Sequence, residues 1–393
     1  MKTPLAWKNL TSSWSKCALA ATGVGFAVVL MFMQIGFQRA LIDNNVRVMS
    51  LVDANVANLA VLSRARYNVS TEQRFPRDLF EQALANPCVR DGMAMTIERG
   101  TARATIEGRA GKPIRVVAFE MGRPDFFADP DLYAKLVEAD RSGAALLDSR
   151  SKRFYGFEEE LADLQEQWIE LNGNRIPIAG RFNLGTDFGN DGTFLMSERL
   201  HSDFFPYRNF GGEPNDVVDI GLLRVDLADG VSLSEVAAQI EALAPEQIMV
   251  QSTDGLIVKE KRFWERQTPV GKIFMIGTIM GLFVGAIICY QIQFTDITEH
   301  MPEFATLKAM GYSPMYFWSL ILSQSFYLAC LGFVPGIAVA QLLYFVLSES
   351  SGLIMEMDLV RIAIVWLLTL MMCIASGALA IRKLFNADPA SLF

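Results

Sequence analysis

Residues 17–37, which read CALAATGVGFAVVLMFMQIGF, form an apolar run of 21 residues without a charged side chain. A helix rises about 1.5 Å per residue, so the run is long enough to cross a hydrocarbon core of roughly 30 Å. It is longer than the apolar region of a typical signal peptide, and no clear small-x-small cleavage site follows it. The three lysines that precede it leave a cleaved signal peptide as the alternative. We interpret the run as a first, uncleaved membrane span.

Three further apolar runs follow in the last third of the chain. Residues 273–292 and residues 359–381, the latter interrupted only by Arg361 near its start, each have the length of one span. Residues 315–347 are longer than one crossing requires and contain Pro335. This third run is either one long, kinked helix or two short half-spans. The sequence therefore predicts an α-helical membrane protein with four transmembrane helices.

The composition agrees with a membrane protein and argues against several other classes. Of the 393 residues, 51% are apolar and 20% are charged, the mean hydropathy is +0.26 and the net charge is −8. An acidic chain is unsuited to nucleic acid, because phosphate binding needs an excess of Lys and Arg. Two histidines and five scattered cysteines leave little room for a metal site or a disulfide framework. We expect neither a metal nor a nucleic-acid partner.

The Lys and Arg residues that flank the spans predict the orientation. The amphipathic N-terminal segment 1–16 carries three lysines and no acidic residue, and the tail 382–393 begins with Arg382 and Lys383. The turn 348–358 has neither Lys nor Arg, whereas the loop 293–314 has only Lys308 as a clear cation. We expect both termini and the loop 293–314 to be cytoplasmic and the turn 348–358 to be outside.

Residues 38–272, between the first two spans, are expected to form a large α+β extracytoplasmic domain on helical stalks. Helical periodicity covers residues 76–85 and 232–243, and Ser232 with Glu235 has the pattern of a capping box. The dipeptide Asn172-Gly173 is a hairpin signal. Residues 38–52 and 253–272 have helix-compatible sequences next to the spans, which predicts the stalks. Strand-like runs occupy residues 56–62, 102–107, 114–119, 168–171, 175–178, 217–225 and 247–251.

The sequence lacks the motifs of the common enzymes. It has no G-x-x-x-x-G-K-[ST] phosphate loop, no H-E-x-x-H and no G-x-S-x-G. Its spans contain almost no ionisable residue, whereas ion-coupled carriers place such residues near the bilayer midplane. We expect a non-catalytic chain without a cofactor of its own, and any transport should draw its energy from a separate chain.

Small residues recur at every fourth position in two of the spans. A face of small side chains lets helix backbones approach closely. Two interpretations are open, packing within one subunit and a seam between the subunits of a dimer. The residues on these faces are Gly277, Gly281 and Gly285 in the second span, and Gly332, Gly336 and Ala340 in the third.

Four features together resemble a known family. They are Ala6-Trp-Lys-Asn-Leu10 before the first span, the large domain after it, the three closing spans, and the motif EFATLKAMGYS at residues 303–313. The chain resembles the MacB/FtsX (type VII) class of ABC transporter permeases over essentially its whole length. It is most similar to the DevC subgroup, in which the ATPase domain fused in MacB is missing.

The loop between the second and third spans contains a predicted short helix. Pro302 suits a helix start, Gly311 suits a C-terminal stop, and Pro314 prevents continuation. The resemblance implies that this is the coupling helix that docks into the ATPase. An interfacial helix that lies on lipid is the alternative. The candidate coupling residues are Glu303, Phe304, Thr306, Leu307, Lys308, Met310 and Gly311, of which Phe304, Leu307 and Met310 form an apolar stripe.

The resemblance also implies a function and partners. It implies the permease subunit of an exporter in the bacterial inner membrane, a homodimer that works with two copies of a cytoplasmic ATPase, which binds ATP and Mg²⁺. ATP hydrolysis there would move the periplasmic domain by mechanotransmission. A substrate, with lipids and glycolipids among the candidates, would leave through a periplasmic membrane-fusion adaptor and an outer-membrane channel. The alternative is an FtsX-like relay that transports nothing and activates an extracytoplasmic hydrolase.

Aromatic segments of the extracytoplasmic domain are candidates for binding the substrate or the adaptor. Their sequence context suggests exposure, and Tyr and Phe are favoured anchors at interfaces. The alternative is that they close the domain's own core. The candidates are Phe126, Phe127, Phe204, Phe205 and Tyr207.

Overall fold

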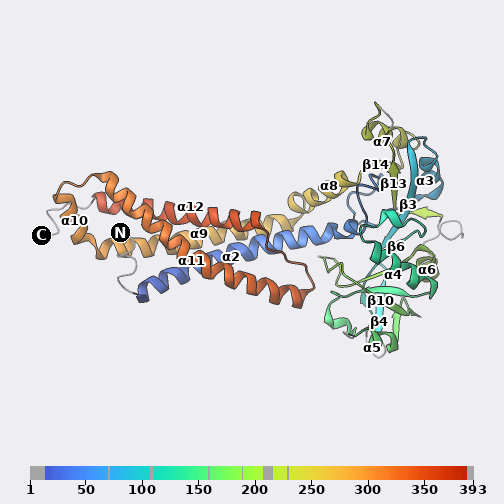
Figure 1. Ribbon diagram of the computed structural model, residues 1–393, viewed down its shortest axis with the longest axis horizontal. Coiled ribbons are helices and arrows are strands. Elements are labelled where there is room, and N and C mark those ends of the chain that lie inside the picture. Colours follow the sequence, from blue (N-terminus) through green and yellow to red (C-terminus); the bar gives the residue numbers. More distant parts are fainter. Residues whose placement is uncertain are drawn as a thin grey trace. The chain divides into compact units, whose positions relative to one another are not determined.

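The computed structural model describes residues 14–69, 71–106, 110–157, 160–187, 189–206, 216–227 and 230–386 (Figure 1). The chain divides into two compact units. A helical unit comprises Met1–Arg39, Pro269–Val346 and Met355–Phe393, and a mixed unit comprises Ala40–Thr268 and Leu347–Ile354.

Four long helices make up most of the helical unit. They are long and apolar enough to cross a membrane, which confirms the four predicted spans. The third is one continuous helix with Pro335 inside it, so the two half-spans are not formed. The helices are α2 (Trp14–Val46), α9 (Pro269–Glu299), α11 (Pro314–Ser351) and α12 (Leu359–Asn386), and the short α10 (Met301–Ala309) lies between α9 and α11.

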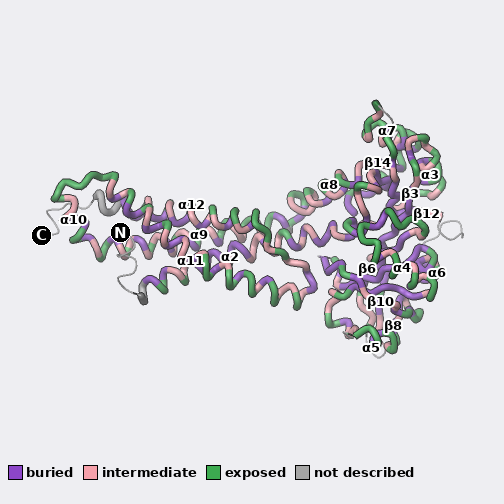
Figure 2. Tube along the Cα trace, viewed as in Figure 1, coloured by how far each residue is buried: buried purple, intermediate pink, exposed green. Residues whose placement is uncertain are grey.

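The first helix packs at the centre of the helical unit. Val24, Val28 and Met31 of α2 are fully buried in a cluster that also includes residues of α9, α11 and α12. Tyr344 of α11 donates a hydrogen bond from Oη to the carbonyl of Phe32 at 2.5 Å. The outer sides of the long helices expose large apolar side chains, as expected for contact with lipid (Figure 2).

The mixed unit is built on an eight-stranded sheet. Most neighbouring strands are antiparallel, and β10 with β7 and β11 with β6 are parallel. In spatial order the strands are β10 (Ile178–Phe182), β7 (Ala145–Asp148), β11 (Thr193–Ser197), β6 (Arg115–Phe119), β3 (Val89–Glu98), β13 (Ile220–Val225), β1 (Leu59–Ser63) and β14 (Ile248–Ser252).

Two small sheets and several helices complete the mixed unit. One sheet pairs β12 (Val217–Val218) with β2 (Phe75–Pro76), and the other has the order β5 (Lys112–Pro113), β4 (Arg103–Ile106), β8 (Ile169–Leu171) and β9 (Asn174–Arg175). The helices are η1 (Arg47–Leu51), α3 (Arg77–Leu84), η2 (Pro124–Phe126), α4 (Pro130–Arg141), η3 (Arg153–Tyr155), α5 (Leu161–Glu166), α6 (Glu198–Phe204), α7 (Leu233–Glu241) and α8 (Thr253–Arg266).

Both faces of the large sheet are buried. One face, with α4 and α8, forms a single apolar cluster that extends along the sheet. On the other face, α3 and α7 cover the half around β1 and β13, while α6 and the four-stranded sheet cover the half around β6 and β11. The predicted α+β class is confirmed, with one sheet running through the whole unit.

Local sequence signals match the structure at several places. The Ser232 and Glu235 capping box is present with both of its hydrogen bonds at the start of α7. Asn172 and Gly173 have φ values of +53° and +82° and connect the antiparallel strands β8 and β9, as the hairpin signal predicts. The sequence reasoning missed β3, β7 and β11 as well as the helices α4, α5 and α6.

A buried ion pair connects the loop after β1 to the centre of the sheet. Arg66 donates from Nη1 to Oδ1 of Asp219 at 2.7 Å and from Nη2 to the carbonyl of Val69 at 2.9 Å. The second carboxylate oxygen of Asp219 accepts the backbone N–H of Ile97 at 2.9 Å. Since the Arg66 and Asp219 side chains are 1% and 0% exposed, neither charge can be solvated if its partner is removed.

Two arginines in this loop allow a direct comparison of buried and exposed pairing. Arg66→Gln leaves the Asp219 carboxylate buried without its counter-charge, and we expect a loss of about 3–5 kcal/mol in the free energy of unfolding. Arg64, whose side chain is 41% exposed, pairs with Glu241. Arg64→Gln should cost about 0–1 kcal/mol, because exposed pairs contribute little. Denaturant unfolding of the full chain in detergent measures the stability loss in both variants. Equal losses would contradict the interpretation that burial makes the Arg66–Asp219 pair the more important one.

Candidate functional site

The predicted docking helix is present as α10, which begins one residue before Pro302. Its C-terminus is closed by two hydrogen bonds, from Gly311 N–H to the carbonyl of Lys308 at 3.1 Å and from Tyr312 N–H to the carbonyl of Leu307 at 3.2 Å. Gly311 has φ +86°, a conformation that favours glycine. This is the Schellman arrangement, so α10 has a defined end before α11 begins.

One face of α10 anchors it to the helical unit. Phe304 is buried among residues of α9, α11 and α12, and its ring lies 6.2 Å from that of Phe317, edge to face. Met301 and Ala305 are buried beside it, and Leu307 is partly buried against the same cluster. Phe304 is therefore unavailable to an ATPase, which corrects its assignment as a coupling contact. Its apolar ring contributes to the packing of the helical unit.

The other face of α10 is exposed. Glu303, Thr306 and Met310 point away from the cluster, and Met310 is 63% exposed. Lys308 is partly buried, and Gly311 is exposed in the turn that follows. The apolar stripe predicted from the sequence is thus divided between two roles. Phe304 and Leu307 face inward, while Met310 is presented to the surroundings.

Polar groups connect the three helices next to α10. Gln293 of α9 donates from Nε2 to the carbonyl of Cys373 in α12 at 3.1 Å, and its Oε1 accepts from Ser325 of α11 at 2.8 Å. Gln324 of α11 donates to the carboxylate of Asp296 in α9. Hydrogen bonds between apolar helices keep them in register. These hydrogen bonds link α9, α11 and α12 to one another.

The recurrent glycines pack within one chain. A Cβ atom at Gly332 would lie 2.4 Å from Val24, and one at Gly336 would lie 2.8 Å from Val28, so α11 approaches α2 closely at both. In α9, a Cβ at Gly277 would meet Gln34 at 2.6 Å, and one at Gly285 would meet Met372 at 2.4 Å. At Gly281 the nearest atom is Leu30 Cβ at 3.6 Å. These contacts within the chain are those that the interpretation of packing within one subunit predicts.

The aromatic candidates of the mixed unit are largely core residues. Phe126 and Phe127 belong to the cluster beneath the sheet, where Phe127 lies 4.8 Å from the ring of Phe119. Phe204 and Phe205 are buried on the opposite face. The prediction that these four rings are exposed is wrong, because η2, α6 and the residue that follows each of them pack onto the sheet. Tyr207 lies outside the described residues.

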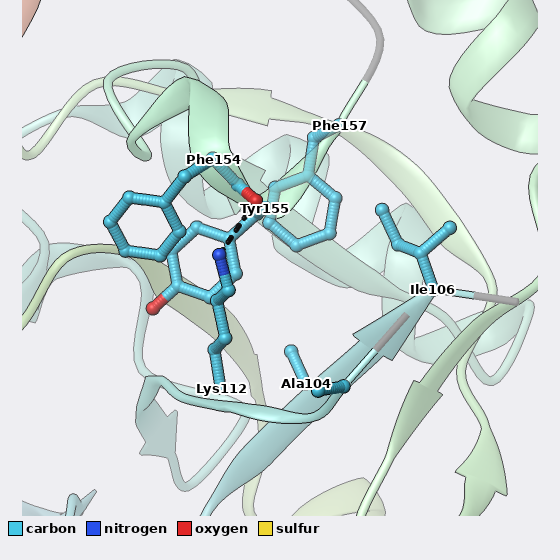
Figure 3. Close-up of a pocket in the computed structure, with 7 residues that line it drawn as sticks. Ala104, Ile106, Lys112, Phe154, Tyr155 and Phe157 are labelled. Atoms are coloured by element: carbon cyan, nitrogen blue, oxygen red, sulfur yellow. Dashed lines mark hydrogen bonds between the residues drawn. The ribbon is translucent and has the colours of Figure 1, made fainter. Parts of the chain in front are cut away.

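Three other aromatic residues gather at a pocket of about 290 Å³ beside the four-stranded sheet, where Phe154 is exposed, Phe157 half-buried and Tyr155 buried (Figure 3). Phe154, Tyr155 and Phe157 form one wall, and the Tyr155 and Phe157 rings stack at 5.2 Å. Lys112 Nζ lies 3.9 Å from the Phe154 ring centre and donates to the Phe154 carbonyl at 3.0 Å. The sequence analysis missed this pocket, although the aromatic-rich stretch 153–157 is a signal that could have indicated it.

Buried carboxylates in the mixed unit have structural partners. Burial raises the pKa of Asp148, although its oxygens accept backbone N–H groups of Leu184, Arg150 and Gly185. Burial likewise raises the pKa of Glu260, which accepts from Val69 N–H and Trp264 Nε1. Within the described residues, no group of three His, Cys, Asp or Glu side chains could hold a metal ion.

Two glycines give a matched test of the helix packing. Gly332→Ala places a methyl group against Val24 and the backbone of Gly25, so we expect a loss of about 1–3 kcal/mol from overpacking and a lower Tm. Gly281→Ala meets only ordinary contacts, and its Tm should be unchanged or slightly higher, since Ala favours helix. Thermal unfolding in detergent distinguishes them, and a stable Gly332→Ala variant would show that α2 and α11 pack more loosely.

Two solved structures and one protein family are similar to parts of this chain. The periplasmic region of MacB from Actinobacillus actinomycetemcomitans is 8% identical with a TM-score of 0.34, covering 55% of this chain and 96% of that one. The extracellular domain of the noncanonic ABC-type transporter YknZ from Gram-positive bacteria is 10% identical with a TM-score of 0.32, covering 49% of this chain and 98% of that one. No curated protein sequence matches the chain. Residues 275–389, which include α10, match the family described as FtsX-like permease C-terminal.

Proposed function

We propose that this chain is the permease subunit of an ABC exporter and that a separate cytoplasmic ATPase docks on α10. The observation that carries the proposal is the match of residues 275–389, which include α10, to the FtsX-like permease family. The chain has no phosphate-binding loop of its own, so ATP and Mg²⁺ are assigned to the partner. The chain itself acts without catalysis.

Docking uses the exposed face of α10. Glu303 offers a carboxylate, Thr306 a hydroxyl group and Met310 a flexible apolar side chain, which is suited to a groove on a partner. A helix lying flat on lipid would be held by basic residues around its apolar side, and the only cation of α10 is the partly buried Lys308. The burial of Phe304 keeps α10 attached to its own helices while it is pushed or pulled.

Motion of α10 would be transmitted through the helices that flank it. The polar contacts of Gln293 and Gln324 join α9, α11 and α12 near α10. Two of the long helices, α2 and α11, each continue without a break from residues of the helical unit to residues of the mixed unit. We propose that ATPase closure moves the mixed unit along this route, as mechanotransmission, and that the substrate does not pass between the spans.

The wider assembly is part of the same proposal. The chain acts as a homodimer with two ATPase copies in a bacterial inner membrane, with both termini in the cytoplasm and the mixed unit in the periplasm. A membrane-fusion adaptor and an outer-membrane channel complete the export path. Since the glycine faces are filled by internal packing, the dimer contact must use other surfaces of the helical unit. Lipids and glycolipids are the proposed substrate class.

Charge changes on the exposed face of α10 test the docking. We expect Glu303→Lys and Met310→Asp each to weaken ATPase binding by about 2 kcal/mol or more, roughly thirtyfold, because short docking helices rely on a few desolvated anchors. Copurification in mild detergent, with the ATPase identified by mass spectrometry, measures this. Glu246→Lys, an equal charge reversal at an exposed site of the mixed unit, is the control. Undiminished copurification in both variants would mean that α10 rests on lipid.

Crosslinking from the mixed unit tests the export path. A photoreactive residue in place of Phe154, which is 41% exposed at the aromatic pocket, should give adducts with an adaptor or substrate in whole envelopes. Leu243, 45% exposed at the other half of the sheet, is the matched control. Adducts with an extracytoplasmic hydrolase instead would favour the alternative function, an FtsX-like relay that transports nothing. Adducts only from a lipid-facing position such as Met280 would favour passage through the bilayer and contradict the proposal.

A further inference from the structure

A basic groove lies within the mixed unit, where the last turn of α11 meets the loop after β7. Its walls are formed by Ser149–Arg153, by Arg181 of β10 and Asn183 just after it, and by Ser348–Ser350 with Gly352, and its volume is about 460 Å³. A second pocket, lined by Arg47, Asp129 and Lys135 among others, shares Ser149, Arg181 and Asn183 with it. The two pockets are therefore neighbours.

Several hydrogen bonds hold the α11 turn in the groove wall. Arg150 donates from Nη1 to Ser348 Oγ at 3.1 Å, and Thr186 donates from Oγ1 to the carbonyl of Ser351 at 3.0 Å. The Thr186 N–H donates to the carbonyl of Gly352 at 3.2 Å. Gly352 has φ +74°, and a Cβ there would lie 2.4 Å from the carbonyl oxygen of Arg150. Specific contacts therefore fix this wall of the groove, and no residue larger than glycine fits at Gly352.

Positive charge dominates the lining. Arg150, Lys152, Arg153 and Arg181 face one acidic side chain, Glu349, which lies 3.4 Å from Arg153. Lys152 also pairs with Asp191 at 2.5 Å, just beyond the lining. Among the described residues, the lining of this groove thus includes four cationic side chains and one carboxylate. Guanidinium groups beside serine hydroxyls are the donor set that binds phosphate oxygens.

The groove is close in sequence to the end of a membrane span. Ser348 follows directly on Leu347, the last residue of the apolar run of α11. A helix rises about 1.5 Å per residue, so Ser348 to Gly352 extend roughly 6 Å beyond the apolar run, within the headgroup layer of a bilayer. A soluble anion could reach the groove from the water, but a lipid headgroup is held at this depth by its own acyl chains.

We propose that the basic groove binds the phosphate headgroup of an anionic membrane lipid. Arg150 and Arg181 contact the phosphate, and Ser348 to Ser350 border it from the α11 side. The acyl chains remain in the bilayer beside α11. Binding of this kind depends on α11 spanning the membrane and does not depend on the ATPase docking at α10. Its failure would therefore leave the proposed function untouched.

Lipid retention by the full chain tests this site. The protein is placed in nanodiscs of phosphatidylcholine mixed with phosphatidylglycerol, and the lipids that remain bound are identified by native mass spectrometry. We expect the wild-type chain to retain phosphatidylglycerol preferentially. Arg150→Gln should reduce this preference about fivefold, the effect of one charge near the membrane surface, and Arg150→Lys should restore most of it. Arg90→Gln, a change at an exposed arginine of the same unit, should have no effect.

A second variant and a soluble competitor make the outcome decisive. Ser350→Glu adds a negative charge at an exposed position of the wall, and it should lower retention without disturbing the fold. Glycerol phosphate added in solution should compete weakly. Equal retention of the two lipids by the wild type, or full retention in both Arg150→Gln and Ser350→Glu, would overturn the site. Complete displacement by glycerol phosphate would overturn the lipid assignment and identify a soluble anion as the ligand.

Discussion

The close approach of α2 and α11 is the contact on which the helical unit depends. Inside a bilayer, apolar side chains gain nothing by leaving lipid for each other, so helices associate through tight packing and hydrogen bonds. Gly332 and Gly336 let α11 reach Val24 and Val28 of α2, and the hydrogen bond from Tyr344 to Phe32 lies further along the same helix. α9 and α12 pack against this pair. The first helix, α2, therefore packs against three helices that are far from it in the sequence.

α10 is a short helix with one buried face and one exposed face. Its sequence stripe of Phe304, Leu307 and Met310 suggested one apolar surface for one role. In the structure, Phe304 packs against the chain's own helices, and the side with Glu303, Thr306 and Met310 remains exposed. The stripe is divided in this way because residues three apart on a helix diverge by about 60°.

The sequence predicted those features that depend on local chemistry. Span lengths follow from the apolar runs, the α7 capping box follows from Ser232 and Glu235, and the end of α10 follows from Gly311. Features that depend on tertiary burial were missed. β3 and β11 are buried on both faces and show no alternation, and Phe126 and Phe205 occur in polar segments that fold inward. The basic groove combines residues almost 200 positions apart, from Arg150 to Ser348, so no local pattern could indicate it.

The end of α11 and the residues up to Ile354 belong to the mixed unit rather than to the helical unit, and this has a consequence for biogenesis. Ribosomes complete Ala40–Thr268 long before they reach Leu347–Ile354. The surface around Arg150 and Thr186 can therefore already be folded when Ser348 and Ser351 are made and bond to it. A segment made late in synthesis thus completes a domain that was made much earlier.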